Sequence, residues 1–288
     1  MLKVLITGSS GMLGGYVMRR LEKEKYDIIA PTRAELDLTQ PQNVYDFICN
    51  AMPDYILHLG AETNVDLCER NPRLAGIVNH LATRAVALAA RDTKAYMVYI
   101  STSIVFGGTE IKPIFYELDI PSPINYYGKS KLLGEREIEN IYPDNALIIR
   151  AGWMVGGGPS HDHKFVGKIM KQINSGVERL RVVSDKYGTI TLASTLADFI
   201  ITSLKSQRVG LVHYASSGIV SRFDIAKELV HLTLYKGEID PVSSRELVLS
   251  APRPVFDGIS SLYIDSNTSN APGFWRDDLR AYMKEFDL

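Results

Sequence analysis

Tyr127 and Lys131 stand four residues apart in the stretch Tyr127-Gly128-Lys129-Ser130-Lys131. On a helix, this spacing places both side chains on one face. Tyrosine titrates near pH 10 in water, but a neighbouring positive charge stabilises the phenolate and lowers the pKa. We therefore expect Lys131 to depress the pKa of Tyr127, which can then give a proton to a substrate oxygen and speed that step about 10²- to 10⁴-fold. For this pair alone, a surface helix is the alternative interpretation.

Three glycines near the start of the chain predict a partner for this chemistry. Gly8, Gly11 and Gly14 follow the apolar run Lys3 to Thr7 and precede an amphipathic stretch. Turns and helix caps also use glycine. A strand, a glycine turn and a helix in succession, however, bring backbone N–H groups close to a dinucleotide pyrophosphate. Together with Tyr127 and Lys131, the turn indicates hydride transfer to a carbonyl.

A third group of residues ends a buried strand in hydroxyl side chains. Ser101, Thr102 and Ser103 follow the apolar run that begins at Ala95. A hydroxyl there can bond the carbonyl oxygen of a substrate and share the phenol's proton. The alternative is a hydroxyl that caps the strand end or a turn.

The end of the second predicted strand bears on the choice of nicotinamide cofactor. A carboxylate there would bond a ribose 2′-OH, whereas an arginine would favour a 2′-phosphate. This chain has Arg33 at that point, followed by Glu35. NADPH is therefore favoured, with NADH as the alternative, although Arg33 also fits a solvated loop charge. Asp37 and Leu38 come next and can hold the adenine edge.

Strand and helix patterns alternate through residues 1–150, which we predict to form the dinucleotide-binding domain. Apolar strands flanked by helices imply a doubly wound parallel sheet, an α/β Rossmann fold, with its ligand beyond the carboxyl ends of the strands. The predicted strands are Lys3 to Thr7, Tyr26 to Ala30, Asp54 to Leu59, Ala95 to Ser101 and Ala146 to Arg150. The predicted helices are Met12 to Glu24, Gln42 to Ala51, Leu74 to Arg91 and Ser130 to Asn140.

Residues 151–288 are predicted to form mainly a smaller substrate-binding region. The glycine-rich loop from Gly156 to His163 opens it. Two segments near 181–215, namely Arg181 to Ser184 and Gly210 to Ala215, are strand-like and are expected to return to the Rossmann sheet. The smaller region would then be discontinuous in sequence.

Composition limits the classes of partner. The 288 residues are 45% hydrophobic and 23% charged with a net charge of -1, so nothing favours nucleic acid or an anionic membrane. Without a signal peptide or membrane span in the pattern, we expect a cytoplasmic location. Cys49 and Cys68 are expected to be ordinary thiols. His161-Asp162-His163 favours a solvated loop, so we predict no metal site. The oligomeric state stays open, a homodimer included.

With these residues in view, the chain resembles the dTDP-4-dehydrorhamnose reductase family, within the extended short-chain dehydrogenases/reductases. The likeness runs nearly end to end. It is carried by the glycine turn and by the stretches Thr32 to Thr39, Gly60 to Asp66, Ser101 to Phe106, Pro123 to Glu135, Arg150 to Trp153 and Ala251 to Pro254.

The resemblance implies a function and a set of site residues. The function is NAD(P)H-dependent reduction of the C4 keto group of a nucleotide-linked 4-keto-6-deoxy sugar, with Thr102, Tyr127 and Lys131 catalytic. Trp153 would pack against the sugar, and Arg253 would anchor the nucleotide. The candidate cofactor-binding residues are Gly8, Ser9, Ser10, Gly11, Met12, Leu13, Arg33, Asp37, Leu38, Leu59, Gly60, Ala61, Thr63, Tyr127 and Lys131. The candidate substrate-binding residues are Thr102, Ser103, Tyr127, Trp153 and Arg253.

The chain departs from the family pattern in its substrate pocket. Family members usually carry an acidic residue and a tyrosine after the catalytic threonine, where this chain has Ser103 and Ile104. Asp185 to Thr191 lacks a proline common in the family, and the loop at His161 to Lys164 is longer than expected. A substrate with a different keto sugar or a different nucleotide therefore stays an alternative. A nucleotide-sugar epimerase or dehydratase, and a non-catalytic regulatory subunit like the beta subunit of methionine adenosyltransferase, are the alternative functions.

Overall fold

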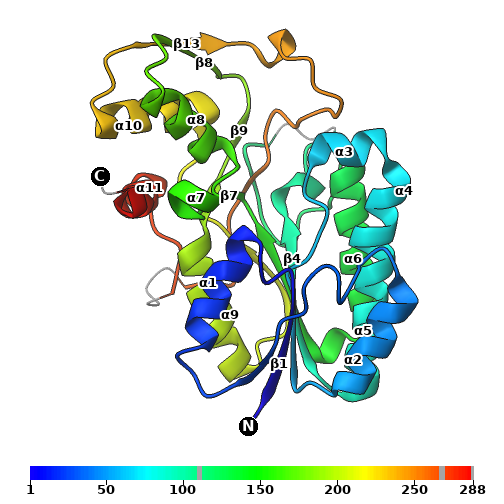
Figure 1. Ribbon diagram of the computed structural model, residues 1–288. Helices are drawn as coiled ribbons and strands as arrows, with labels where there is room; N and C mark the ends of the chain where they lie inside the picture. Colours follow the sequence, from blue (N-terminus) through cyan, green and yellow to red (C-terminus); the bar gives the residue numbers. More distant parts are fainter. Residues whose placement is uncertain (109–111, 266–269, 287–288) are drawn as a thin grey trace.

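The computed structural model describes residues 1–108, 112–265 and 270–286, and its centre is a six-stranded sheet (Figure 1). The strands lie in the order β11-β6-β4-β3-β1-β2, and each neighbouring pair is parallel. Helices cover both faces, so the predicted doubly wound Rossmann fold is confirmed. The sheet strands are β1 (Lys3–Thr7), β2 (Asp27–Ile29), β3 (Tyr55–His58), β4 (Tyr96–Thr102), β6 (Ala146–Ala151) and β11 (Gly210–Tyr214).

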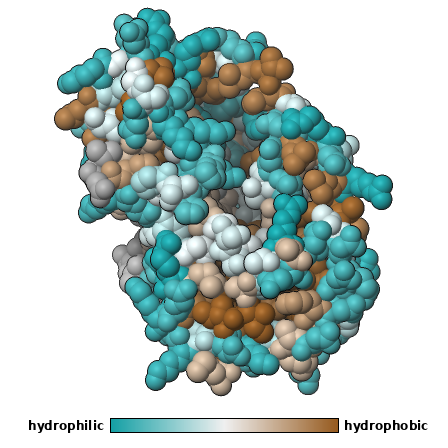
Figure 2. All heavy atoms as spheres, viewed as in Figure 1, coloured by the Kyte–Doolittle hydropathy of each residue, from teal (hydrophilic) through white to brown (hydrophobic). Residues whose placement is uncertain are grey.

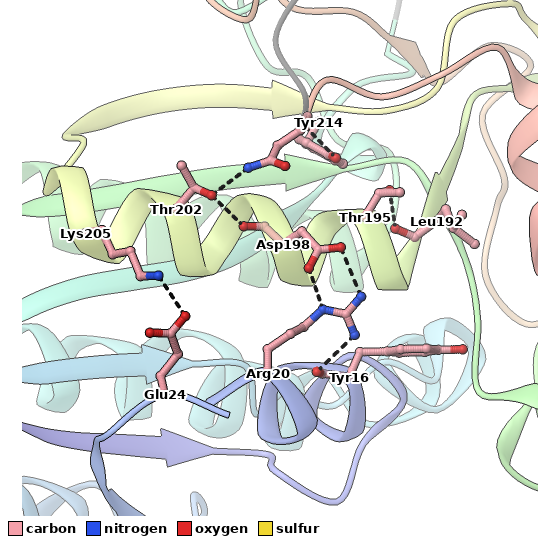
Figure 3. Close-up of polar contacts among 10 residues, drawn as sticks. Tyr16, Arg20, Glu24, Leu192, Thr195, Asp198, Thr202, Lys205 and Tyr214 are labelled. Carbon is pink, nitrogen blue, oxygen red and sulfur yellow. Dashed lines mark hydrogen bonds and ion pairs between the residues drawn. The ribbon is translucent and has the colours of Figure 1, made fainter. Parts of the chain in front are cut away.

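Two helices far apart in sequence cover one face of the sheet. They are α1 (Met12–Leu21) and α9 (Ala193–Ser206), whose apolar side chains share one buried core with the strands. At the helix surface, the Arg20 guanidinium donates two hydrogen bonds to the Asp198 carboxylate, with N–O distances of 2.7 and 3.0 Å (Figure 3). Exposed ion pairs contribute only about 0–1 kcal/mol. The apolar core therefore holds the two helices together, and the ion pair adds little to this.

The opposite face is covered by α2 (Pro41–Ala51), α5 (Ala82–Thr93) and α6 (Tyr126–Ile141). The helix predicted from Leu74 to Arg91 differs from the observed structure. It divides into α4 (Pro72–Ala75), a π-helical segment (Gly76–Leu81) and α5, preceded by the short α3 (Val65–Arg70). A π-helical turn inserts an extra residue and redirects the side chains around it. Periodicity alone does not reveal such an insertion.

The remaining elements form a smaller region above the sheet in Figure 1, toward the carboxyl ends of the strands. Its strands pair in twos: β7 with β10, β8 with β13, β9 with β12, and β5 with β14. The strand bounds are β5 (Ile114–Phe115), β7 (Trp153–Val155), β8 (Arg179–Val183), β9 (Tyr187–Gly188), β10 (Ile190–Leu192), β12 (Val220–Ser221), β13 (Glu238–Val242) and β14 (Gly258–Ile259). The helices are α7 (Gly158–His161), α8 (Phe165–Asn174), α10 (Arg222–Thr233) and α11 (Trp275–Met283).

The two strand-like segments near 181–215 have different destinations. Gly210–Tyr214 forms β11 and pairs with β6 at the edge of the main sheet, as expected. The segment at Arg181 belongs to β8, which pairs with β13 instead, so its expected return to the main sheet is wrong. The reason lies in packing, because Leu180 and Val182 are buried in the core of the smaller region. No helix of the described residues is long and apolar enough to cross a membrane.

Candidate active site

The glycine turn lies between β1 and α1 and is built by close backbone contacts. Gly8 has a φ of +74°, and a Cβ on it would lie 2.7 Å from the backbone of Gly60. A Cβ on Gly14 would lie 2.3 Å from the carbonyl oxygen of Gly8. Glycine is therefore required at both positions, once by conformation and once by the packing of α1 on the turn.

The turn leaves backbone N–H groups for a ligand. Gly11 caps α1 through its backbone, and no described side chain accepts a hydrogen bond at this cap. The N–H groups of the first turn of a helix, which include those of Met12 and Leu13, have no intrahelical acceptor. Ser9 and Ser10 lie in the turn itself. The residues present thus fit the pyrophosphate of a dinucleotide.

The loop after β2 places the predicted adenine-side residues near this turn. Leu38 approaches Gly60, since its Cδ1 would lie 2.8 Å from a Cβ on that glycine. Arg33 is exposed. The Asp37 carboxylate accepts from the backbone N–H and the hydroxyl of Thr39 at 2.9 and 2.8 Å, and these bonds lower its pKa. Asp37 therefore shapes the turn, and its contact with adenine stays a prediction.

The segment after β3 runs beside the glycine turn. Leu59 donates its N–H to the carbonyl of Thr7 at 3.2 Å, and Gly60 donates to the Thr7 hydroxyl at 3.1 Å. Ala61 follows directly. Thr63 accepts a hydrogen bond from Nζ of Lys164 at 3.1 Å, which links the Rossmann part to the smaller region. These four candidates therefore lie at the same sheet edge as Gly8.

Thr102 and Tyr127 meet at the end of β4. Asn125 caps α6 by accepting the N–H of Gly128 at 2.9 Å, so the helix begins at Tyr126 and carries Tyr127 and Lys131. Thr102 is the last residue of β4, and its side chain interacts with the Tyr127 phenol, an interaction that lowers the pKa of the phenol. The hydroxyl and the phenol, which the sequence expected at one edge, are thus brought together.

The expectation that Lys131 lowers the pKa of Tyr127 is wrong. Burial raises the pKa of Tyr127 to about 12, although the interaction with Thr102 acts in the opposite direction. Burial also lowers the pKa of Lys131 to about 7, against the effect of Glu135. Both side chains lie where water stabilises neither charge, so the neutral phenol predominates at physiological pH. The ammonium instead lies 4.0 Å from the centre of the Tyr99 ring.

A buried ion pair fixes the helix that carries these groups. Glu135 of α6 accepts from Arg150 of β6, with the shortest N–O distance 2.6 Å, and Ser101 of β4 donates to the same carboxylate. Both charged side chains are almost fully buried. Removing one partner of such a pair costs about 3–5 kcal/mol. The pair therefore keeps α6 in place against the strand that ends in Thr102.

Asn79 in the π-helical segment is a positioning residue that the sequence reasoning missed. Its side-chain oxygen accepts the N–H of Glu62 at 2.8 Å, and its amide donates to the Glu62 carbonyl at 3.0 Å and to Ser130 Oγ at 3.1 Å. The side chain thus ties the loop after β3 to α6 beside Lys131. The one sequence signal for Asn79 was a polar residue inside an apolar helical pattern. That pattern does not reveal the π-helical turn that directs the side chain.

Ser103 and Trp153 meet through a residue that was not predicted, Asp257. Ser103 Oγ donates to Asp257 at 2.9 Å, and the Trp153 indole N–H donates to both carboxylate oxygens at 3.1 and 3.0 Å. Burial raises the pKa of Asp257, while these two donors lower it. A carboxylate from a distant segment therefore stands beside the residue that follows Thr102, where the chain departs from the family pattern.

Arg253 already has partners within the chain. Its guanidinium donates to Asp66 at 2.7 Å and to the carbonyl of Ala251 at 2.8 Å, so it fastens this segment to α3. Its contact with a nucleotide stays a prediction. In the loop at 161–163, Asp162 accepts from the backbone N–H of Gly167 at 2.9 Å and the Tyr282 hydroxyl at 2.8 Å. That carboxylate supports the loop, and the described residues contain no cluster of three or more metal-ligating side chains.

Figure 2 shows the surface hollowed in the centre of the view, between the smaller region and the sheet domain. The hydrogen bonds from Lys164 to Thr63 and from Ser103 to Asp257 cross between these two parts of the chain. The site therefore lies where the two regions meet, at the carboxyl ends of the strands. This is the usual place for ligands in open α/β sheets.

Comparison with known proteins adds independent findings. A family model described as RmlD substrate binding domain matches residues 2–288. The spore coat polysaccharide biosynthesis protein SpsK of Bacillus subtilis is 33% identical over 285 residues, which cover 99% of this chain and 98% of SpsK.

Two crystal structures are similar over almost their whole length. A dTDP-4-dehydrorhamnose reductase from Yersinia enterocolitica is 49% identical with a TM-score of 0.97, and the match covers 99% of this chain and 100% of that one. A dTDP-4-dehydrorhamnose reductase from Bacillus anthracis, in complex with NADP, is 30% identical with a TM-score of 0.91 over 99% and 100% of the two chains.

Proposed function

The chain belongs to the dTDP-4-dehydrorhamnose reductase family, and on that premise we propose that it reduces the C4 keto group of a nucleotide-linked 4-keto-6-deoxy sugar. The substrate would be dTDP-4-dehydrorhamnose and the product dTDP-L-rhamnose. NADPH is the cofactor and NADH the alternative, since the relative from Bacillus anthracis was crystallised with NADP. The observation that carries the proposal is that the Thr102 side chain, at the end of β4, and the Tyr127 phenol, in the first turn of α6, come together at the sheet edge where the glycine turn also lies.

The residues of the chain divide the chemical work. When bound, NADPH supplies the hydride that reduces the carbonyl carbon. The Thr102 hydroxyl orients the carbonyl oxygen, and Tyr127 holds the proton at its phenolic oxygen. Because burial raises the pKa of Tyr127 to about 12, this proton is present throughout the physiological range. An alkoxide is a far stronger base than the phenolate, so the proton passes to the sugar oxygen, and the Thr102 hydroxyl then donates to the phenolate.

Other side chains hold the two ligands. The N–H groups of Met12 and Leu13 would bind the pyrophosphate of the cofactor, and Lys131 would bond the nicotinamide ribose. Trp153 offers an aromatic surface for the sugar. Arg253, whose guanidinium donates to Asp66, would contact the nucleotide.

The test is a turnover assay with purified protein, NADPH and dTDP-4-dehydrorhamnose. We expect stoichiometric loss of NADPH absorbance and formation of a dTDP-6-deoxyhexose whose C4 carries a hydroxyl. Product without net NADPH consumption would instead mark an epimerase, which regenerates its cofactor. Binding of neither NADPH nor dTDP in a thermal-shift panel that includes UDP and GDP would contradict the proposal, since a ligand of the native state raises its melting temperature.

Three further predictions accompany this function. A cytoplasmic location, a homodimer and a division of the chain near residue 150 into cofactor and substrate parts all stay predictions. Fractionation of the source cells, the mass of the chain in solution and limited proteolysis with and without NADPH test them respectively.

A further inference from the structure

Arg222 is the first residue of α10, and its guanidinium packs against Trp153, the residue to which we assign the sugar. The guanidinium carbon is 4.0 Å from the centre of the Trp153 ring and 4.9 Å from that of Phe165. The edge of the same indole is held by Asp257. Arg222 therefore covers one face of the aromatic residue to which we assign the sugar.

The guanidinium retains its hydrogen-bonding capacity. A guanidinium has five N–H donors, and none of those of Arg222 has a hydrogen-bond or ion-pair partner among the described residues. Every fully buried side-chain nitrogen and oxygen in that part of the chain does have a partner. The nitrogens of Arg222 therefore keep access to solvent, while the side chain as a whole is half-buried. Such donors favour a ligand with several acceptor atoms.

Charges of both signs surround this position. Burial lowers the pKa of Arg222 to about 10, Asp257 opposes this, and the charge of Arg253 adds to it. The charge of Arg222 in turn contributes to the lowered pKa of Lys164, of which burial is the main cause. Arg253 is neutralised by Asp66, whereas Lys164 has the hydroxyl of Thr63 as its partner. Arg222 and Lys164, two cations of the smaller region, thus form no ion pair among the described residues, although Asp257 acts on the pKa of Arg222, and Glu62 and Asp162 act on that of Lys164.

We propose that Arg222 binds the diphosphate of the nucleotide sugar, with Lys164 as its neighbour, while it stacks on Trp153. The planar fork of arginine matches phosphate oxygens in a fixed geometry. A diphosphate is joined directly to C1 of the sugar, so a group that contacts the sugar platform is within reach of it. The contacts from Arg222 through Trp153, Asp257 and Ser103 lead to Thr102. This inference rests on the proposed function and specifies its substrate contacts.

The test compares a nucleotide with its nucleoside. Dissociation constants for dTDP, thymidine and NADPH are measured by calorimetry for the wild type, Arg222→Gln and Lys164→Gln. Arg181→Gln is the matched control, because Arg181 is an exposed arginine of the same region. We expect Arg222→Gln to raise the dissociation constant for dTDP at least about tenfold, since a charge-assisted hydrogen bond is lost. The dissociation constants for thymidine and NADPH should stay within twofold of the wild-type values. Arg222→Lys should restore part of the affinity for dTDP, because it keeps the charge without the fork.

The outcomes separate the two levels of the proposal. An unchanged ratio of dTDP to thymidine affinity in Arg222→Gln overturns the role of Arg222. If both affinities fall equally, so that the ratio is unchanged, Arg222 only supports Trp153. If the wild type binds UDP instead of dTDP, the base assigned under the proposed function is wrong, and the ratio is then taken between UDP and uridine. A wild type that binds no nucleoside diphosphate overturns both.

Discussion

The indole N–H of Trp153 donates to both carboxylate oxygens of Asp257, a residue 104 positions later in the chain. Ser103 donates to the same carboxylate from the segment that follows Thr102. One buried acid therefore fastens the aromatic residue on β7 to the end of β4. The distance between the sugar platform and the carbonyl-binding hydroxyl is thus set by side chains, without a shared strand.

We expect Asp257→Ala to lower the free energy of unfolding by about 1–3 kcal/mol, because it leaves a buried N–H without an acceptor. The KM for the sugar substrate should rise, while the affinity for NADPH stays unchanged. Asp257→Asn should recover most of both losses, since its carbonyl accepts from Trp153 and its amide can donate to Ser103. Denaturant unfolding and steady-state kinetics measure the effects, with Asp240→Ala as an exposed control. Wild-type stability of Asp257→Ala would contradict the role.

Tyr127→Phe removes the proposed proton donor and keeps the ring. We expect kcat/KM for the keto sugar to fall about 10²- to 10⁴-fold, with NADPH affinity and melting temperature close to those of the wild type. Tyr126→Phe is the matched control, because Tyr126 is the exposed neighbour on the same helix. Turnover of Tyr127→Phe within a few-fold of the wild type would rule out the phenol as the acid.

Gly14 and Gly15 are adjacent in α1 but differ in their surroundings. A Cβ on Gly14 would lie 2.3 Å from the Gly8 carbonyl oxygen, whereas on Gly15 the nearest atom, an Arg19 nitrogen, would be 3.8 Å away. Gly14→Ala should therefore displace the turn and abolish measurable NADPH binding. Gly15→Ala should bind NADPH normally and gain about 0.5–1 kcal/mol of stability. Calorimetry and thermal unfolding on the pair decide this, and equal NADPH affinity in both variants would refute the packing argument.

The parts of the site that the sequence predicted are those built from neighbouring residues. The strand, turn and helix around Gly8 and the hydroxyl group at the end of β4 are local patterns, and the i,i+4 spacing placed Tyr127 and Lys131 on one helix. Their meeting with Thr102 follows because, in a doubly wound fold, the helix that follows a strand begins near the carboxyl ends of the strands, where Thr102 lies. The main sheet was predictable for the same reason.

The parts that were missed depend on tertiary contacts. Asp257 lies 154 positions from Ser103, in a segment without helical or strand periodicity, so no spacing could connect them. Arg222 follows a two-residue strand, and its stacking on Trp153 depends on how α10 docks. The predicted direction of the shift in the Tyr127 pKa was wrong because the sequence shows a neighbouring lysine but not the burial of both groups.

The lowered pKa of Lys131 predicts a pH dependence of cofactor binding. With a pKa of about 7, the ammonium loses its proton as the pH rises above neutrality. If the charged form bonds the nicotinamide ribose, NADPH affinity should fall above pH 7 by up to about tenfold per pH unit. Lys131→Met should bind NADPH more weakly, with no such slope between pH 7 and pH 9. Fluorescence titrations measure this, with Lys129→Met as the exposed control, and equal slopes in Lys131→Met and the wild type would contradict it.

His58 gives the protein a distinct acid sensitivity. It is buried at the end of β3, where its ring bonds the hydroxyls of Thr7 at 2.7 Å and Thr83 at 3.1 Å. Burial lowers its pKa to about 3, and the charge of Lys131 adds to this effect. The unfolded chain, with a histidine pKa near 6.5, therefore binds more protons than the folded chain between about pH 3 and 6.5. Stability from this group is complete above pH 6.5 and is lost as the pH falls through that window.

We therefore expect the free energy of unfolding to fall between pH 6.5 and pH 5, with His58 contributing up to about 1.4 kcal/mol per pH unit. His213, whose pKa burial lowers to about 4, should add in the same direction. Most carboxylates titrate below this range, so the histidines dominate the slope. In His58→Gln the slope, measured by urea unfolding, should shrink by the contribution of one group even though the variant is less stable overall. His231→Gln, at an exposed position, should leave the slope unchanged. A slope in His58→Gln equal to that of the wild type would mean that His58 takes up a proton without cost in the folded protein.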